Sequence, residues 1–378
     1  MKKRVRIGIL GGGQLARMSA HQAYKLGFEI AILEKKPRSP AGMLTQYDYA
    51  GWVDDKKLLR KFTQKCDIIT LENEFIDYKD LEFIEKAGRK VLPSSKTISL
   101  IQDKFIQKKT FRRNGIPVPK FIEVRDTSTY KSIANKIGSR FILKSRKMGY
   151  DGYGNAFVKD ESSYTGGIKE LSGRHSQLMA EELIDFRKEL AVMIVRTKKE
   201  TKAYPIVETI QKDHICHTVI APAAISRRVK KTAEEISINA VEAVKGYGLF
   251  GIELFLTRDD KILVNEMAPR PHNSGHYTIE ACVTSQFENH IRAILDLPLG
   301  STEMVKPAAV MINLLGKKEG LGIVEDYGEA LKDENVHLHI YGKEMSRYGR
   351  KMGHITMLGS NTKTILARLK KIEPKIII

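Results

Sequence analysis

The sequence contains few cysteines and one tryptophan, and it lacks any apolar run approaching the roughly 20 residues that a membrane-spanning helix needs. The cysteines Cys66, Cys216 and Cys282 are scattered and show no metal-ligand spacing. These absences exclude a disulfide scaffold, make a structural zinc site improbable and favour a reduced, cytoplasmic protein without membrane association. The basic start of the chain is followed by Gly11, Gly12 and Gly13 before an apolar region develops, so we expect no targeting signal.

Acidic residues are scarce relative to basic ones. The chain has 64 Lys and Arg against 45 Asp and Glu, giving a net charge of +19. Clustered basic residues are typical of nucleic-acid binding, but here they are dispersed, as in Arg112-Arg113, Arg227-Arg228 and Lys370-Lys371, without interleaved aromatic residues. The charge therefore predicts a solvated basic surface with a few phosphate-binding positions and no nucleic-acid partner.

The length of 378 residues favours two or three domains. Residues 1–98 alternate apolar strands at 5–10, 28–33 and 67–71 with amphipathic helices, which predicts a parallel, doubly wound sheet. A single helix is expected from about Lys96 to Asn114, ended by Gly115 and two prolines. Residues 99–300 then read as an antiparallel α+β domain of strands and long loops, and residues 301–378 as a small β-rich lobe with one helix at 362–371.

A glycine-rich loop follows the first strand. Its sequence, from Gly11 to Ala16, fits a dinucleotide fingerprint, and Glu34 ends the next strand where a ribose-binding acid would lie. A nicotinamide-dependent dehydrogenase is one hypothesis. Small residues at a helix N-terminus suit any anion, however, so a ribonucleotide phosphate fits equally well.

A second glycine-rich segment follows the strand that ends at Lys144. It runs from Lys147 to Asn155 and can fold over phosphate groups, or form a surface hairpin. Farther along, Glu181, Glu182 and Glu189 interrupt an apolar strand pattern. Buried acids need a partner, which a cationic side chain or a nucleotide would supply.

Two acidic residues flank the turn at Asp259-Asp260. If the turn is symmetric, Glu253 and Glu266 lie opposite each other, about 5 Å apart at Cβ. Two ionised carboxylates this close repel, and Mg²⁺ with nucleotide phosphates would hold them together. A shared proton or a general acid/base pair is the alternative.

The segment from Ala268 to Tyr277, APRPHNSGHY, places Arg270, His272, Asn273 and His276 in one proline-stiffened loop. With Asn265-Glu266 before it and SQFE at 285–288 after it, this loop closely resembles the N5-carboxyaminoimidazole ribonucleotide synthetase family of the ATP-grasp superfamily. Segments 11–18, 149–155, 311–316, 341–343 and 349–354 extend the resemblance along nearly the whole chain.

The resemblance implies a Rossmann-like pre-ATP-grasp domain, a central ATP-grasp domain, a small C-terminal lobe and a homodimer. It implies that ATP, bicarbonate and 5-aminoimidazole ribonucleotide give N5-carboxyaminoimidazole ribonucleotide, ADP and phosphate in purine synthesis. ATP would first phosphorylate bicarbonate, and the exocyclic amine would capture the carboxyphosphate or the CO₂ released from it.

Site residues are implied by position. The expected ATP contacts are Lys104, Lys144, Gly149, Tyr150, Asp151, Gly152, Tyr153, Gly154, Asn155, Glu181, Glu182, Leu183, Ile184, Glu189, Gln211, His214, Asn265 and Glu266. Mg²⁺ would be held by Glu253 and Glu266. The expected ribonucleotide contacts are Gln14, Leu15, Glu74, Arg270, His272, Asn273, Lys343 and Arg350, and the expected catalytic residues are Asp151, Arg270 and Lys343.

The chain departs from the family pattern at two positions. Tyr153 stands where the family usually has Lys, so phosphate binding would depend on Lys147 or Lys144. Gln211 stands where the family has His, and His214 follows three residues later, which leaves open which of them contacts the nucleotide.

A dehydrogenase or a nucleic-acid-binding protein would have no role for the paired carboxylates.

Overall fold

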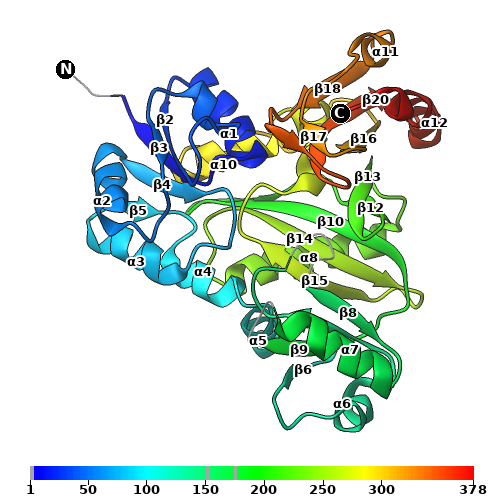
Figure 1. The fold of residues 1–378 in the computed structure, drawn as a ribbon. Coiled ribbons are helices and arrows are strands. Elements are labelled where there is room, and N and C mark those ends of the chain that lie inside the picture. The colour runs from blue at the N-terminus through cyan, green and yellow to red at the C-terminus, as the bar shows by residue number, and fades with distance from the viewer. Residues whose placement is uncertain (1–3, 150–153, 174–176) are drawn as a thin grey trace.

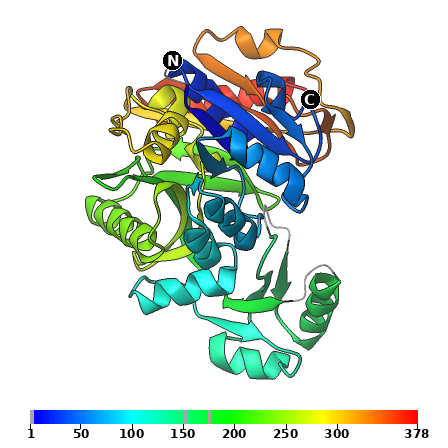
Figure 2. The same cartoon turned by 90° about the vertical axis from the view of Figure 1, so that its left-hand side faces the viewer.

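The computed structural model describes residues 4–149, 154–173 and 177–378 (Figure 1). Three main sheets organise the chain. The sheet formed by segments between 121 and 182 lies at one end of the molecule, and the N-terminal and C-terminal parts lie at the opposite end (Figures 1 and 2). Within the described residues, no helix has the length and apolar character to cross a membrane.

The N-terminal domain is a five-stranded parallel sheet in the order β3-β2-β1-β4-β5, as predicted. Its strand residues are apolar because helices cover both faces of such a sheet. The strands are β1 (Arg6–Leu10), β2 (Glu29–Glu34), β3 (Asp48–Ala50), β4 (Ile68–Leu71) and β5 (Lys90–Val91), and the helices are α1 (Gln14–Lys25), α2 (Lys56–Lys65), α3 (Tyr78–Lys86) and α4 (Ser95–Ile101).

The single helix predicted from Lys96 to Asn114 was wrong: the segment forms α4 and a separate α5 (Lys104–Arg113). Asp103 separates them. Its carboxylate accepts hydrogen bonds from the N–H groups of Phe105 (2.9 Å) and Ile106 (3.1 Å), so it caps a new helix instead of continuing the old one.

A four-stranded antiparallel sheet, hereafter the small sheet, follows in the order β6-β9-β7-β8. The strands are β6 (Phe121–Val124), β7 (Phe141–Ser145), β8 (Asn155–Val158) and β9 (Leu178–Glu182), and its helices are α6 (Tyr130–Ile137) and α7 (Glu161–Ser172). The prediction of strands and long loops missed α7, whose Gly166 and Gly167 weaken the helical pattern, and whose start is fixed by a capping box at Asp160.

A nine-stranded sheet, hereafter the large sheet, runs in the order β15-β14-β10-β12-β13-β16-β20-β18, with β11 beside β10. Its strands are β10 (Phe186–Arg196), β11 (Thr201–Ala203), β12 (Val207–Lys212), β13 (Ile215–Ala221), β14 (Gly248–Thr257), β15 (Ile262–Ala268), β16 (Ala308–Leu315), β18 (Val336–Ile340) and β20 (Lys351–Gly359). The accompanying elements are α8 (Arg227–Ala243), α9 (Thr278–Ala281), α10 (Gln286–Ile294), α11 (Gly328–Leu331), α12 (Thr362–Ile372), β17 (Gly320–Leu321) and β19 (Met345–Ser346). The 17-residue α8, capped by Ser226, was also missing from the prediction.

The C-terminal lobe shares this sheet with the central domain. Its β16 pairs with β13 antiparallel, with Thr218 opposite Ile312. Sheet hydrogen bonds therefore connect the tail directly to the central strands, and side chains of the tail can reach a site built on them.

Candidate active site

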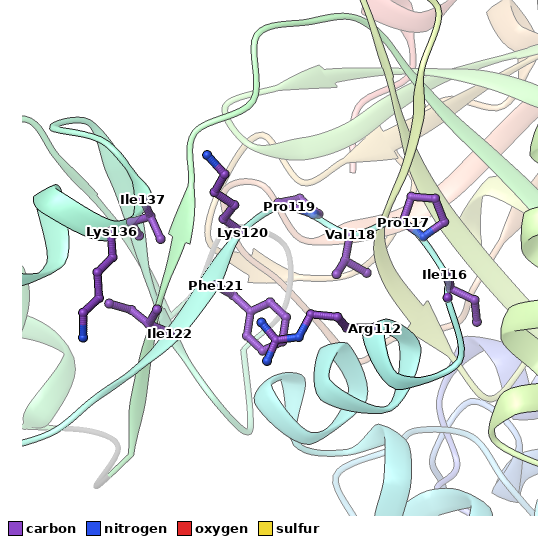
Figure 3. Close-up of a pocket in the computed structure, with 11 residues that line it drawn as sticks. Arg112, Ile116, Pro117, Val118, Pro119, Lys120, Phe121, Ile122, Lys136 and Ile137 are labelled. Carbon is purple, nitrogen blue, oxygen red and sulfur yellow. The ribbon is translucent and has the colours of Figure 1, made fainter.

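A groove of about 490 Å³ lies between α5, the linker after it and the small sheet (Figure 3). Its lining residues are Arg112, Gly115, Ile116, Pro117, Val118, Pro119, Lys120, Phe121, Ile122, Lys136 and Ile137. They include no carboxylate, imidazole or thiol, so the groove offers no side chain that would ligate a metal ion. Titratable side chains gather instead where α5, the small sheet and the large sheet meet.

Glu253 on β14 lies opposite Glu266 on β15, as predicted, but for a different reason. The turn is not symmetric: Thr257 N–H donates to the Lys261 carbonyl, which encloses a three-residue loop. A bulge at Asn265 then restores the pairing, because Leu254 lies opposite Val264 and Glu253 opposite Glu266.

The pKa values of the two carboxylates are shifted in opposite directions. Burial, reinforced by Glu266 and Glu189, raises the pKa of Glu253 to about 7. Burial acts on Glu266 as well, but its ion pair with Lys104 on α5 outweighs it and lowers the pKa of Glu266. Glu253 and Glu266 still expose 35% and 32% of their side chains, so a ligand can reach both. Two facing acidic side chains, one with a raised pKa, fit a divalent cation.

Two lysines and one glutamate connect α5 with both sheets. Glu181 on β9 accepts hydrogen bonds from Lys144 of β7 (2.6 Å) and pairs with Lys108 of α5 (2.6 Å). These lysines lower the pKa of Glu181 to about 2 despite its burial. Lys144 also donates to the Asn265 Oδ1 atom at 3.3 Å, and the Asn265 amide donates to Glu253 at 3.3 Å.

The expected adenine and ribose segment forms the connection between the small and large sheets. Glu182 ends β9 and accepts a hydrogen bond from the Lys120 N–H (3.1 Å), while Leu183 and Ile184 lead into β10. Burial raises the pKa of Glu189, opposed by a hydrogen bond from Gln211 and by the charge of His214. Gln211 and His214 therefore both lie close to Glu189.

The expected phosphate loop is only partly within the described residues. Tyr150, Asp151, Gly152 and Tyr153 lie outside them, whereas Gly149, Gly154 and Asn155 lie within them. Gly154 has φ +82°, and a Cβ atom there would lie 3.1 Å from the Ser145 side chain. A larger residue would be strained at this end of the loop.

The N-terminal glycine loop is occupied by side chains of the chain itself. Gly12 N–H donates to Glu34 (2.9 Å), while Gly13 and Leu15 N–H donate to Glu72 (2.5 and 3.2 Å). Burial raises the pKa of Glu72. Two carboxylates at this helix N-terminus would repel a dinucleotide pyrophosphate, which argues against the dehydrogenase hypothesis. The Leu15 side chain packs in the core and its N–H is held by Glu72, so a ligand contact to this N–H would have to displace that carboxylate.

The loop after β15 is held rigidly. Gln286 accepts from His272 N–H (3.0 Å) and donates to its carbonyl (2.8 Å). Arg270 forms two hydrogen bonds with Glu74, one of them at 3.0 Å between Nη2 and Oε1. His272 lies 3.5 Å from Glu253, and the Asn273 amide pairs with the Asn313 amide of β16 (2.9 and 2.6 Å). Arg270 and His272 thus face acidic groups, whereas Asn273 is engaged by the C-terminal lobe.

The C-terminal lobe brings one cation, Lys343, to the N-terminal loop. Lys343 donates to the Lys351 carbonyl (2.6 Å), and its charge opposes the rise in the pKa of Glu72 that burial causes. Arg350 donates to the Met345 carbonyl (2.6 Å). The structure therefore gathers Glu72, Arg270 and Lys343 from three parts of the chain.

Comparisons with known proteins cover nearly the whole chain. Three family models match the chain. Residues 1–102 match the ribonucleotide synthetase preATP-grasp domain, residues 109–287 the ATP-grasp domain, and residues 309–368 the phosphoribosylaminoimidazole carboxylase C-terminal domain. The N5-carboxyaminoimidazole ribonucleotide synthase of Synechococcus elongatus is 37% identical over 97% of this chain and 95% of its own. This chain belongs to the N5-carboxyaminoimidazole ribonucleotide synthase family.

Solved structures of the synthase family have the same fold. The N5-carboxyaminoimidazole ribonucleotide synthetase of Thermotoga maritima superposes with a TM-score of 0.88 at 41% identity, covering 99% of both chains. The synthase of Aspergillus clavatus, solved with ADP and 5-aminoimidazole ribonucleotide, has a TM-score of 0.89 at 34% identity, covering 98% of both chains. Phosphoribosylaminoimidazole carboxylases of fungi and plants are also similar, and this chain spans 65% to 69% of their length.

Sequence reasoning missed several residues of this synthase-family site. Lys108 holds Glu181, Glu72 holds the glycine loop, and Gln286 holds the loop after β15. Lys108 had a usable signal, because it follows Lys104 by four residues and therefore lies on the same helix face. Gln286 lies in the SQFE segment that carried the resemblance, but its partner is 14 residues away and its role was not predicted; Glu72 had no signal, since its partner lies 59 residues away.

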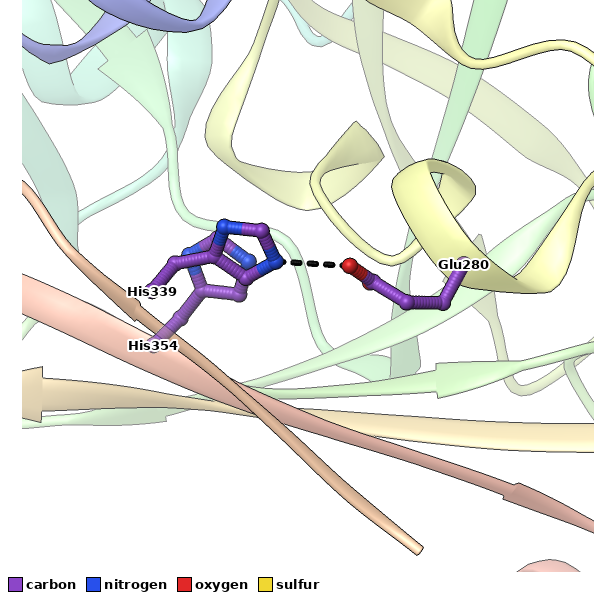
Figure 4. Close-up of side chains that lie close together, drawn as sticks. All are labelled: Glu280, His339 and His354. Carbon is purple, nitrogen blue, oxygen red and sulfur yellow. Dashed lines mark hydrogen bonds and ion pairs between the residues drawn. The ribbon is translucent and has the colours of Figure 1, made fainter.

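A histidine cluster joins α9 to the C-terminal lobe. His339 forms a 2.6 Å contact with Glu280, and its ring stacks on His354 with centroids 4.4 Å apart at 11° (Figure 4). These three residues are close enough to be considered as metal ligands. Nearly parallel rings, however, cannot direct their in-plane lone pairs at one ion. The three residues therefore form a hydrogen-bonded contact between α9 and the C-terminal lobe.

Proposed function

We propose that this chain uses ATP to join bicarbonate to the exocyclic amine of 5-aminoimidazole ribonucleotide, giving N5-carboxyaminoimidazole ribonucleotide, ADP and phosphate. One observation carries the proposal: the facing carboxylates Glu253 and Glu266 lie between the lysines Lys104 and Lys144 on one side and the Arg270–His272 loop on the other. Family membership and the relatives' complexes with ADP and ribonucleotide support it.

ATP would lie between the small sheet and the large sheet. Lys104 and Lys144 would contact its phosphates, residues 149–155 would cover them, and residues 181–184 with Glu189 would hold adenine and ribose. Gln211 and His214 lie beside Glu189, which supports a contact from either residue. Asn265 links Lys144 to Glu253 and would keep the phosphate and metal positions in register.

Mg²⁺ would be held by Glu253 and Glu266 together with ATP phosphates. Their pairing across β14 and β15, with a raised pKa at Glu253, supports this assignment. When bound, the ion would neutralise charge on the transferring phosphoryl group. Lys104, which pairs with Glu266 in this structure, would then be released toward the phosphates.

The ribonucleotide would lie across the N-terminal and C-terminal parts of the chain. Arg270, His272, Lys343 and Arg350 would supply its cationic and hydrogen-bonding contacts. The Gln14 and Leu15 backbone, Glu74 and Asn273 complete the expected set. Glu74 pairs with Arg270 here, so a bound phosphate would compete with that carboxylate for the guanidinium group.

The reaction would proceed in two transfers. A bicarbonate oxygen attacks the γ-phosphorus of ATP. The bond between this phosphorus and the ADP oxygen breaks, and carboxyphosphate forms. The ribonucleotide amine then attacks the carboxyl carbon, or the CO₂ released from it, and phosphate leaves with the bonding electrons. Asp151 is the proposed acceptor of the amine proton. Fixed cations at the transferring group stabilise developing charge and supply most of the catalysis.

Two further expectations stay predictions. A homodimer and a cytoplasmic location follow from the family resemblance and from the cysteine content, and Cys66, Cys216 and Cys282 are buried free thiols. The partition of the chain into residues 1–98, 99–300 and 301–378 also stays a prediction.

An isotope experiment tests the proposed route. With ¹⁸O-labelled bicarbonate and short reaction times, one labelled oxygen should appear in the released phosphate, because the attacking bicarbonate oxygen stays on phosphorus. Unlabelled phosphate, formed while labelled bicarbonate remains, would show that water and not bicarbonate attacks ATP.

A further inference from the structure

Lys108 is a buried lysine for which neither the sequence nor the proposed function supplies a role. Its side chain is 2% exposed. The ammonium group lies 2.6 Å from Glu181 Oε2, 2.8 Å from the Asn265 carbonyl oxygen and 3.4 Å from the Val264 carbonyl oxygen. Three oxygen atoms therefore surround the ammonium group, two as hydrogen-bond acceptors and one as an ion-pair partner. Burial lowers the pKa of Lys108 to about 8 and Glu181 opposes this, so the group stays charged near neutral pH.

Glu181 is shared by two lysines. Its Oε1 atom accepts from Lys144 at 2.6 Å, while its Oε2 atom faces Lys108. One carboxylate and two ammonium groups leave one positive charge in excess. Because two partners of Lys108 are backbone carbonyls of β15, this lysine is fixed. Lys144 has one short contact and one at 3.3 Å, and its side chain is 11% exposed. Of the two lysines, Lys144 is the one that can change partner.

We propose that Lys108 is a positioning residue that neutralises Glu181 permanently, so that Lys144 can leave Glu181 and bind the nucleotide phosphates. The inference rests on the proposed function, in which Lys144 contacts ATP. Without Lys108, Glu181 would hold a single counter-ion, and moving Lys144 to a phosphate would leave a buried carboxylate unpaired. An uncompensated buried charge is strongly unfavourable, so Lys144 would stay on Glu181.

A purely structural role predicts a different pattern. Lys108 also ties α5 to β15 through the Val264 and Asn265 carbonyls, and its loss could loosen the contact between α5 and the large sheet. That damage would not depend on the charge of Glu181. The charge role, in contrast, disappears once Glu181 is made neutral, because Lys144 then has no carboxylate to leave.

A double-mutant cycle separates the two roles. The dissociation constant of Mg-ADP is measured by calorimetry for wild type, Lys108→Gln, Glu181→Gln and the double variant. We expect Lys108→Gln to weaken ADP binding at least about tenfold in the wild-type background and less than about threefold in the Glu181→Gln background, a coupling typical of contacting charges. Equal factors in the two backgrounds, or no weakening in the first, would overturn the inference.

Two controls make the outcome specific. Lys109→Gln, the next residue on α5, should leave ADP binding unchanged. Lys108→Met is a second neutral variant. It replaces Lys108→Gln in the same cycle of Mg-ADP dissociation constants if Lys108→Gln does not fold. Lys144→Met is measured in parallel: if it binds ADP like wild type, the proposed nucleotide site fails and this inference fails with it. If Lys144→Met is weakened but Lys108→Gln is not, only the role of Lys108 is removed.

Discussion

At the scale of single residues, the site depends on acids whose neighbours set different charge states. Glu266 pairs with Lys104 and has a lowered pKa, whereas Glu253, beside Glu266 and Glu189, has a pKa raised to about 7. Glu181 lies between two lysines and has a pKa lowered to about 2. The sequence predicted that Glu253 and Glu266 face each other and that Glu181 contacts ATP, but the pKa of each acid depends on neighbours from other elements.

Glu266→Ala should reduce ATP turnover at least about a hundredfold, which corresponds to roughly 2.7 kcal/mol of transition-state stabilisation. The variant removes one of the two proposed metal ligands and leaves Lys104 without its carboxylate. Steady-state phosphate release at saturating Mg²⁺ measures the effect. Glu235→Ala, on the exposed side of α8, is the control and should retain full activity. Activity of Glu266→Ala within a few-fold of wild type would refute the metal assignment.

Arg270→Ala should raise the KM for the ribonucleotide at least about tenfold, as expected for loss of a hydrogen-bonded charge, with the KM for ATP changing less than about threefold. Arg270→Lys keeps the charge but loses the paired N–H geometry, so it should recover only part of the loss. Arg258→Ala, an exposed arginine of the β14–β15 loop, is the matched control. An unchanged dependence on the ribonucleotide would remove Arg270 from the substrate site.

At the scale of elements, the start of α5 decides where Lys104 and Lys108 point. Asp103 caps the helix and pairs with the buried Arg146, which directly follows β7 of the small sheet. The sequence predicted helix throughout this region, because helical periodicity continues across the break. The break itself comes from the capping side chain and from Arg146, 43 residues away, so only its local part could have been predicted.

Asp103→Ala should destabilise the protein by about 3–5 kcal/mol, because it removes the cap and leaves Arg146 with fewer carboxylate partners. Asp103→Asn keeps the capping oxygen, so it should cost about 1 kcal/mol less. Urea unfolding measures both. Asp77→Ala, at the exposed N-terminus of α3, removes a cap alone and should cost about 1 kcal/mol. Equal effects of Asp103→Ala and Asp77→Ala would contradict the importance of the ion pair.

The contact between α10 and the N-terminal sheet contains a buried histidine. His290 is 1% exposed, contacts the Thr70 hydroxyl at 3.1 Å, and has a pKa lowered to about 4 by burial. Between pH 6.5 and 4 the unfolded chain gains a proton at this position that the folded chain does not. The stability associated with neutral His290 is therefore lost as pH falls through this window.

His290→Gln should thus make the protein less sensitive to acid. Between pH 7 and pH 5 the free energy of unfolding of wild type should fall by about 2 kcal/mol more than that of the variant. Urea unfolding at the two pH values measures this difference. His337→Gln, at an exposed position on β18, is the control and should follow wild type. Parallel pH dependence of His290→Gln and wild type would contradict the assignment of a neutral His290.

At the scale of the whole molecule, side chains from three parts of the chain converge on one site. The N-terminal domain supplies Glu72 and Glu74, the paired sheets supply the carboxylates and lysines, and the C-terminal lobe supplies Lys343. The sequence predicted the parallel sheet, the antiparallel centre and the strands of the tail. It did not predict that β16 continues the large sheet, because its pairing with β13 joins residues about 90 positions apart and leaves no local pattern.

The most direct test of the central claim is phosphate release from Mg-ATP in the presence of bicarbonate, with and without 5-aminoimidazole ribonucleotide. The proposed ligase requires all the substrates, so release should depend on the ribonucleotide and should match the ribonucleotide consumed in a one-to-one ratio. No release from folded protein with any combination of these substrates, or release unaffected by the ribonucleotide, would contradict the proposed function.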